Sequence, residues 1–250
     1  MTVPDAGGGS DAPGDDRAAA LAAALARVRE RIDDAARAAG RDPAGIELLA
    51  VTKTWPASDA AHLVDLGLCC FGENKEQEGA AKAAALAELR PGTTVAWRVV
   101  GQLQRRKSRA VVRWADAVDS VDSPRLAASL DAAASSAIDA GERTGPLPVL
   151  LQVSLDGDPD RGGVRREELA ALADDVGEAA GLRLDGLMAV LPRDVEPGRG
   201  FADLAEIAAG LRAGHPDATT LSAGMSTDLA DAIEHGSTCV RVGTALLGGR

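Results

Sequence analysis

The choice between two α/β folds rests on the segment Leu48-Leu49-Ala50-Val51-Thr52-Lys53-Thr54-Trp55-Pro56. Its apolar first half predicts a short buried strand, which ends at a lysine and a turn. A doubly wound open sheet would carry a glycine-rich dinucleotide fingerprint directly after this strand, and none is present. The segment therefore favours a closed barrel of parallel strands, with the open sheet as the main alternative.

The rest of the chain alternates short apolar runs with longer helical segments, which is typical of parallel strands joined by crossover helices. Eight strands are predicted, near Glu47 to Thr52, Cys69 to Gly72, Ala96 to Val100, Ala117 to Val121, Val149 to Ser154, Gly186 to Val190, Thr220 to Ala223 and Val240 to Val242. Seven helices are predicted between them, near Ser58 to Leu66, Glu76 to Leu89, Leu103 to Trp114, Pro124 to Ala140, Arg166 to Ala180, Phe201 to Leu211 and Asp228 to His235.

An amphipathic helix from Arg17 to Ala39, with a left-handed cap at Gly40, precedes the first strand. Because the sequence ends soon after the eighth strand, this helix is expected to fill the gap in the helical ring. The predicted fold is a single (β/α)8 TIM barrel over residues 17–250. Residues 1–16 are rich in Gly, Asp and Pro and are expected to form a disordered tail rather than a signal peptide.

The composition of the chain argues against several classes of partner and site. A chain of 250 residues with 46% hydrophobic side chains suits one large domain, and a net charge of -11 argues against nucleic acid as a partner. No run of about 18 apolar residues predicts a membrane span. Three cysteines form no disulfide framework, which favours the cytoplasm, and they assemble no metal site with the three histidines.

Lys53 is the first candidate functional residue, because it stands at the carboxyl end of the first strand, where barrel enzymes place their sites. Position alone leaves open whether it serves a site or extends to solvent. Two later segments, Thr220-Leu221-Ser222-Ala223-Gly224-Met225-Ser226 and Arg241-Val242-Gly243-Thr244, follow strands seven and eight, the usual phosphate cradle of barrels. A lysine opposite such a cradle suits pyridoxal 5′-phosphate (PLP), which carries an aldehyde and a phosphate.

Several blocks, in order, resemble the pyridoxal phosphate homeostasis proteins. They are Leu48 to Thr54, Phe71-Gly72-Glu73-Asn74 with Gln77-Glu78, Gly101 with Leu103-Gln104 and Lys107, Gly186-Leu187-Met188, Leu221-Ser222 with Gly224-Met225-Ser226, and Val240-Arg241-Val242-Gly243-Thr244-Ala245. The resemblance implies a fold-type III PLP barrel, similar to the N-terminal domain of alanine racemase, with PLP on Lys53 as an internal aldimine. It also implies a cofactor site in which Ser222, Gly224, Ser226, Gly243 and Thr244 surround the phosphate, Arg241 faces the pyridine nitrogen and Asn74 lies beside the ring.

The function implied is intracellular PLP (vitamin B6) homeostasis by a PLP carrier or regulator without robust catalysis, with PLP-dependent apo-enzymes as candidate partners. A monomer is the default expectation, because aromatic residues are only 2% of the chain and provide no conspicuous anchors for a large permanent interface. Lys75 and Arg98 depart from the family pattern, which usually has an aromatic residue and a histidine there. We expect Lys75 to be a solvated residue at a helix start. The basic cluster of Arg105, Arg106, Lys107, Arg109 and Arg113 is expected to be a solvated helix with ion pairs.

Two enzymatic alternatives remain. An amino-acid racemase of the alanine racemase type would need a lysine and a tyrosine on opposite faces of PLP, and this chain contains no tyrosine. Arg241 at the pyridine nitrogen would also disfavour ring protonation and weaken carbanion stabilisation. The second alternative is a PLP-independent barrel enzyme acting on a phosphorylated sugar, with Lys53 and Glu73 as an acid/base pair.

Overall fold

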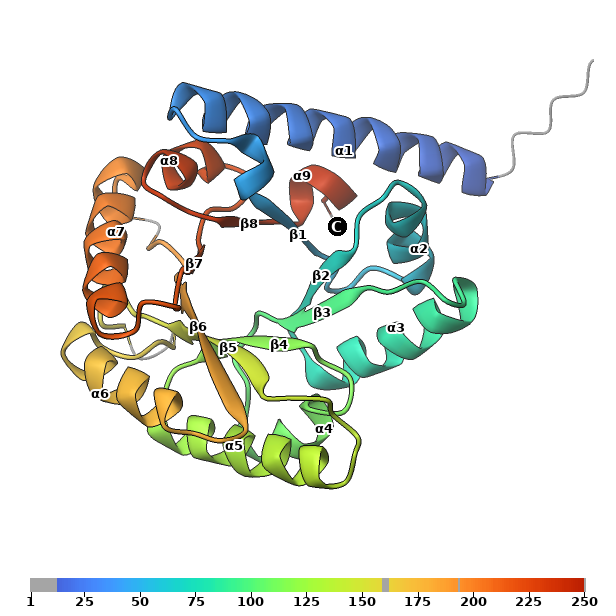
Figure 1. Cartoon of the computed structure of the whole chain (residues 1–250). Helices are drawn as coiled ribbons and strands as arrows, with labels where there is room; N and C mark the ends of the chain where they lie inside the picture. The colour runs from blue at the N-terminus through green and yellow to red at the C-terminus, as the bar shows by residue number, and fades with distance from the viewer. Residues whose placement is uncertain (1–12, 159–161, 193, 250) are drawn as a thin grey trace, which may run out of the picture.

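The computed structural model describes residues 13–158, 162–192 and 194–249. Within them, parallel strands form a closed barrel in chain order, and β8 returns to pair with β1 (Figure 1). The strands are β1 Glu47–Val51, β2 Cys70–Glu73, β3 Ala96–Val99, β4 Ala117–Val121, β5 Leu147–Gln152, β6 Leu182–Met188, β7 Thr220–Ser222 and β8 Cys239–Val242. The predicted (β/α)8 barrel is therefore confirmed, and the open sheet is wrong.

Helices surround the barrel (Figure 1). They are α1 Pro13–Ala38, α2 Ala57–Asp65, α3 Glu76–Leu89, α4 Ser108–Val111, α5 Pro124–Asp139, α6 Arg166–Gly177, α7 Pro197–Gly214, α8 Leu229–Glu234 and α9 Thr244–Leu247, with short 3-10 turns η1 Pro43–Gly45 and η2 Arg105–Lys107. Helix α1 packs against α2, α8 and α9, so the N-terminal helix does complete the ring. It begins at Pro13 rather than Arg17. Residues 1–12 of the predicted tail lie outside the described residues.

One sequence prediction about the helices is wrong. The helix expected from Leu103 to Trp114 is reduced to η2 and α4, because the hydroxyl of Ser108 donates to the carbonyl of Arg105 at 2.8 Å and closes a tighter turn. Leu103 itself is buried in the preceding loop. After the eighth strand, the described residues form one further short helix, α9, which packs on α1.

Side chains of β1 alternate between the barrel interior and the outer core. A Cβ at Gly72 of β2 would lie 3.5 Å from Leu49 and 3.4 Å from Val51, which places both side chains inside. Ala50 instead belongs to the outer cluster that includes Leu21 of α1. Because the side-chain period of a strand is two, the inward series of β1 leads toward position 53 and the outward series toward position 52.

Candidate cofactor site

Lys53 lies at the carboxyl-end mouth of the barrel, where the sequence predicted it. The backbone N–H of Thr52 still donates to the carbonyl of Gly72 at 3.1 Å, so the β1–β2 ladder extends to the residue before Lys53. Thr54, on the other side, has a left-handed backbone with φ 66°. The Lys53 side chain is exposed, whereas that of Thr52 is fully buried.

The two predicted cradle segments contact one another beside β1. The backbone N–H of Ala245 donates to Oγ of Ser226 at 3.3 Å, which joins the loop after β7 to the first turn of α9, just after β8. Gly243 lies against β1, where a Cβ would stand 3.2 Å from the carbonyl oxygen of Val51. Ser226 and Gly243 are half-buried and Thr244 is exposed, so this surface faces the same mouth as Lys53.

Gly224 is required by the backbone of this cradle. Its φ is +87°, and a Cβ there would lie 2.5 Å from Cβ of Ala232. Its carbonyl oxygen accepts from the backbone N–H of Arg241 at 3.0 Å, which couples the loop after β7 to strand β8. Only glycine combines this conformation with this close approach.

Arg241 and Ser222 lie together beneath the cradle. The Arg241 side chain is buried, and its guanidinium donates to the carbonyl and Oγ of Ser222 at 2.6 and 3.0 Å and to the carbonyl of Ala189 at 2.7 Å. Burial lowers the pKa of Arg241. Ser222 is fully buried, so its hydroxyl is a partner of Arg241 in this structure. The predicted roles of both residues toward a cofactor stay predictions.

Asn74 directly follows β2 and is half-buried at the mouth. Gly101, after β3, packs against its backbone, and a Cβ at Gly101 would stand 2.5 Å from the carbonyl oxygen of Asn74. The position of Asn74 therefore depends on a glycine from the neighbouring strand end.

A buried ion pair behind Lys53 was missed by the sequence reasoning. Nζ of Lys82 lies 2.5 Å from Oε1 of Glu73, and the two side chains are 5% and 0% exposed. Burial raises the pKa of Glu73, against the opposing effect of Lys82 and Thr52. The spacing of Gly79, Lys82 and Leu86 on the buried face of α3 is the signal that could have revealed it.

This pairing corrects one alternative. Glu73 is committed to Lys82 of α3 and to the hydroxyl of Thr52, which donates to it at 2.6 Å, and it has no exposed surface. Glu73 is therefore not an acid/base partner of Lys53, and the phosphorylated-sugar hypothesis loses the pair on which it was built.

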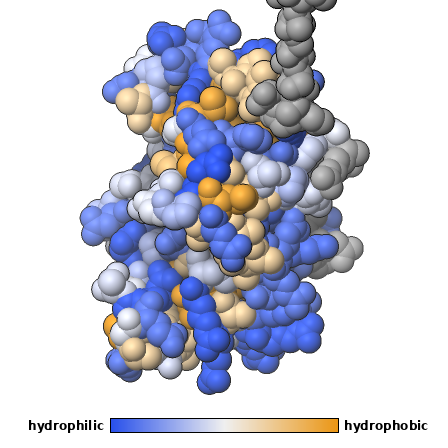
Figure 2. Space-filling view, turned by 90° about the vertical axis from the view of Figure 1, so that its right-hand side faces the viewer, coloured by the Kyte–Doolittle hydropathy of each residue, from blue (hydrophilic) through white to orange (hydrophobic). Residues whose placement is uncertain are grey.

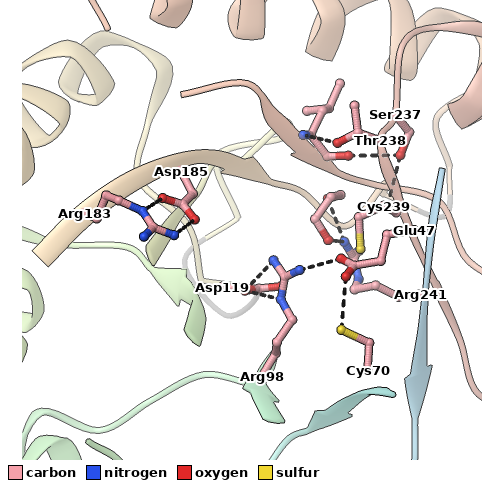
Figure 3. Close-up of polar contacts among 12 residues, drawn as sticks. Glu47, Cys70, Arg98, Asp119, Arg183, Asp185, Ser237, Thr238, Cys239 and Arg241 are labelled. Carbon is pink, nitrogen blue, oxygen red and sulfur yellow. Dashed lines mark hydrogen bonds and ion pairs between the residues drawn. The ribbon is translucent and has the colours of Figure 1, made fainter. Parts of the chain in front are cut away.

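Arg98 fills the barrel interior nearer its amino-terminal end (Figure 3). It pairs with Asp119 at 3.0 Å and with Glu47 at 2.7 Å, and Sγ of Cys70 donates to Glu47 at 3.0 Å. Burial alone lowers the pKa of Arg98, but the carboxylates of Asp119 and Glu47 outweigh it and raise the pKa overall. Burial raises the pKa of Cys239 to about 12, which fits a neutral buried thiol.

The remaining charged candidates lie on the surface. Lys75 is exposed at the N-terminal end of α3. In the basic cluster, Lys107 pairs with Glu76 at 3.0 Å and the arginines are exposed, as predicted, although on short turns rather than one helix. The residues that the structure describes contain no group of three or more metal-ligating side chains. Among the same residues, no helix has the length and apolar character needed to cross a membrane.

Comparisons with known proteins agree with this geometry. The family model described as the alanine racemase N-terminal domain matches residues 23–250. A pyridoxal phosphate homeostasis protein of Mycobacterium tuberculosis is 47% identical over 244 residues, which cover 94% of this chain and 95% of that relative. The structure of PipY from Synechococcus elongatus with PLP bound matches with a TM-score of 0.77 at 32% identity, over 91% of this chain and 100% of PipY.

Alanine racemase from Corynebacterium glutamicum matches with a TM-score of 0.62 at 18% identity, over 92% of this chain but 60% of the racemase. That likeness concerns the fold alone. Together with the family model and the relatives that match almost end to end, it leads to one assignment: this chain belongs to the pyridoxal phosphate homeostasis protein family and has the barrel of the alanine racemase N-terminal domain.

Proposed function

We propose that this protein binds PLP at the carboxyl-end mouth of the barrel and holds it through Lys53, as a carrier in PLP homeostasis. The observation that carries the proposal is the pairing of β1 with β8, which places Lys53 and the Gly243–Thr244 turn on adjacent strand ends. The names of the relatives and the PLP-bound structure of PipY support it.

The residues at the mouth fit both ends of PLP. Ser226, Gly243 and Thr244, positioned by Gly224, would hold the phosphate through hydroxyl and backbone N–H donors. When bound, PLP would supply an aldehyde, and Lys53 would hold it by exchanging its amine nitrogen for the aldehyde oxygen, with release of water.

The ring would lie between the cradle and Lys53. Asn74 is at the correct mouth to lie beside it, and Arg241 is the candidate partner of the pyridine nitrogen. Ser222 then acts by holding Arg241, because both its carbonyl and its hydroxyl accept from that guanidinium. A cationic neighbour disfavours protonation of the ring, so the arrangement suits holding PLP better than stabilising a carbanion.

We further propose a monomer in the cytoplasm that supplies PLP-dependent apo-enzymes. The large hydrophobic side chains exposed in the described residues, Leu89, Val190 and Met225, come from three separate elements or loops. On the face drawn in Figure 2, hydrophilic residues predominate and apolar residues form small groups. The three free cysteines fit a reducing compartment.

The test is borohydride reduction of the PLP-loaded protein, followed by peptide mass analysis. We expect a phosphopyridoxyl group on Lys53 in the wild type and none at any lysine of Lys53→Ala, whereas Lys75→Ala, which removes an exposed lysine of the same mouth, keeps it. An unmodified Lys53 in the wild type would refute the proposal. Racemisation of amino acids at enzyme-like rates would refute the carrier role and favour the racemase.

A further inference from the structure

A charge cluster with a buried ion pair at its centre lies directly behind the segment that carries Lys53. It consists of Glu73 at the end of β2 and of Glu78 and Lys82 on α3. Burying an ion pair removes both charges from water, so such a pair is often no more stabilising than apolar side chains of the same volume. Stability alone therefore gives no account of this cluster.

The cluster binds the backbone on both sides of Lys53. On one side, Nζ of Lys82 donates to the carbonyl oxygen of Thr52 at 2.6 Å, and the hydroxyl of Thr52 donates to Glu73 at 2.6 Å. On the other side, the backbone N–H of Thr54 donates to Oε1 of Glu78. Lys53 is thus flanked by two anchored residues while its own side chain stays exposed.

Thr54 adopts a conformation that needs such an anchor. Its φ of 66° is in the left-handed region, which is unfavourable for a β-branched residue. The hydrogen bond to the carboxylate of Glu78 offsets this cost and fixes the direction in which the chain leaves Lys53. A backbone outlier held by its surroundings next to a site residue is the type of strain that supports preorganisation.

We propose that Glu73, Glu78 and Lys82 are positioning residues that hold the backbone around Lys53 and thereby preset its amine for the attachment of PLP. This inference rests on the proposed function. Lys82 is not a second attachment site, because the three donors of its ammonium group face oxygens of Glu73, Thr52 and Glu78 at 2.5, 2.6 and 3.4 Å.

The test compares Glu78→Ala with Glu88→Ala, which removes the same charge from the exposed end of the same helix. The Glu78 side chain is 27% exposed, so its loss leaves the Thr54 N–H near solvent rather than orphaned in the core. We expect attachment of PLP to Lys53, followed by absorbance and by borohydride trapping, to slow about tenfold in Glu78→Ala alone. Pyridoxine 5′-phosphate has no aldehyde and therefore reports the noncovalent binding of the ring and the phosphate. Its affinity is expected to stay within about twofold, because neither variant alters a residue proposed to contact the ring or the phosphate.

A conservative variant adds a rescue. Glu78→Gln keeps an acceptor oxygen without the charge and is expected to slow attachment only about threefold relative to Glu88→Gln. If Glu78→Ala does not fold, this pair carries the comparison.

Equal attachment rates in the position 78 and position 88 variants would overturn the inference. A loss of pyridoxine 5′-phosphate affinity as large as the loss of rate would also overturn it, since the effect would then be general to the fold. A phosphopyridoxyl group on Lys82 of the wild type would do the same. Failure of the proposed function is a separate result, in which the wild type gains no group on Lys53 at all.

Discussion

The substitution Gly224→Ala tests how strongly the turn after β7 depends on glycine, because its expected loss of stability can be worked out from the structure. An alanine at φ +87° is in the left-handed region, which costs about 1–2 kcal/mol. Its Cβ would also stand 2.5 Å from Cβ of Ala232, and relief of such an overlap costs about 1–3 kcal/mol. The expected loss is the sum, about 2–5 kcal/mol, which for a domain of this size lowers the melting temperature by roughly 5–20 °C.

Two other glycines separate these contributions. Gly40 has φ +68° with no atom within 4 Å of its Cβ position, so Gly40→Ala carries the backbone cost alone, about 1–2 kcal/mol. Gly210 lies within α7 with open space around it, so Gly210→Ala is expected to stabilise by about 0.5–1 kcal/mol. Thermal unfolding of the cofactor-free proteins gives all three values, and PLP titration should show weaker binding in Gly224→Ala alone.

Equal melting temperatures for Gly224→Ala and Gly40→Ala would refute the reasoning, because the close approach to Ala232 would then carry no cost. Unchanged PLP affinity in Gly224→Ala would refute the separate inference that the turn after β7 shapes the phosphate cradle.

Three further outcomes are expected. Gly101→Ala pushes a Cβ to within 2.5 Å of the carbonyl of Asn74, so urea unfolding should show a loss of about 1–3 kcal/mol and PLP titration a weaker complex; an unchanged urea midpoint would contradict this packing. Arg17 pairs at 2.6 Å with the carboxylate of Asp59, whose side chain is 6% exposed. Arg17→Met removes this partner and should lower the free energy of unfolding, measured in urea, by about 1–3 kcal/mol, and Arg17→Lys should recover part of the loss. The backbone N–H groups of Arg199 and Gly198 at the start of α7 lower the pKa of Glu196 from its ordinary value of 4.5. The Glu196 carboxylate therefore stabilises the folded state above pH 4.5, and this stabilisation is lost as the pH falls through the lower pKa of the folded protein. Glu196→Gln should remove this part of the acid dependence of the urea midpoint.

The strands and their order followed from local patterns. Apolar runs bounded by turns indicate buried parallel strands. The change from the apolar Val51 to the charged Lys53 marks the end of one such strand in the sequence, and β1 does end at Val51. The positions of the two cradle segments followed from the rule that barrels place phosphate sites after strands seven and eight, and the structure joins these segments through Ser226 and Ala245. Their role toward a phosphate stays a prediction.

Partners distant in sequence were not predictable. Arg98 reads as a departure from the family pattern, but its partners Asp119 and Glu47 are 21 and 51 residues away, on other strands. Lys82 likewise reads as a helix-surface lysine until α3 is docked on β2 and its ammonium reaches Glu73. Local periodicity states which way a residue faces on its element, whereas such pairings depend on how the elements pack.

The seam between β1 and β8 sets the order in which function is acquired during synthesis. A nascent chain leaves the ribosome with its N-terminal part first, so Lys53 emerges long before the turn at Gly243. Closing the barrel also carries the entropic cost of bringing together two segments that are separated by most of the chain. Lys53 and the turn at Gly243 therefore meet only when the final strand docks, and an arrested translation product that lacks this strand would lack the proposed PLP site.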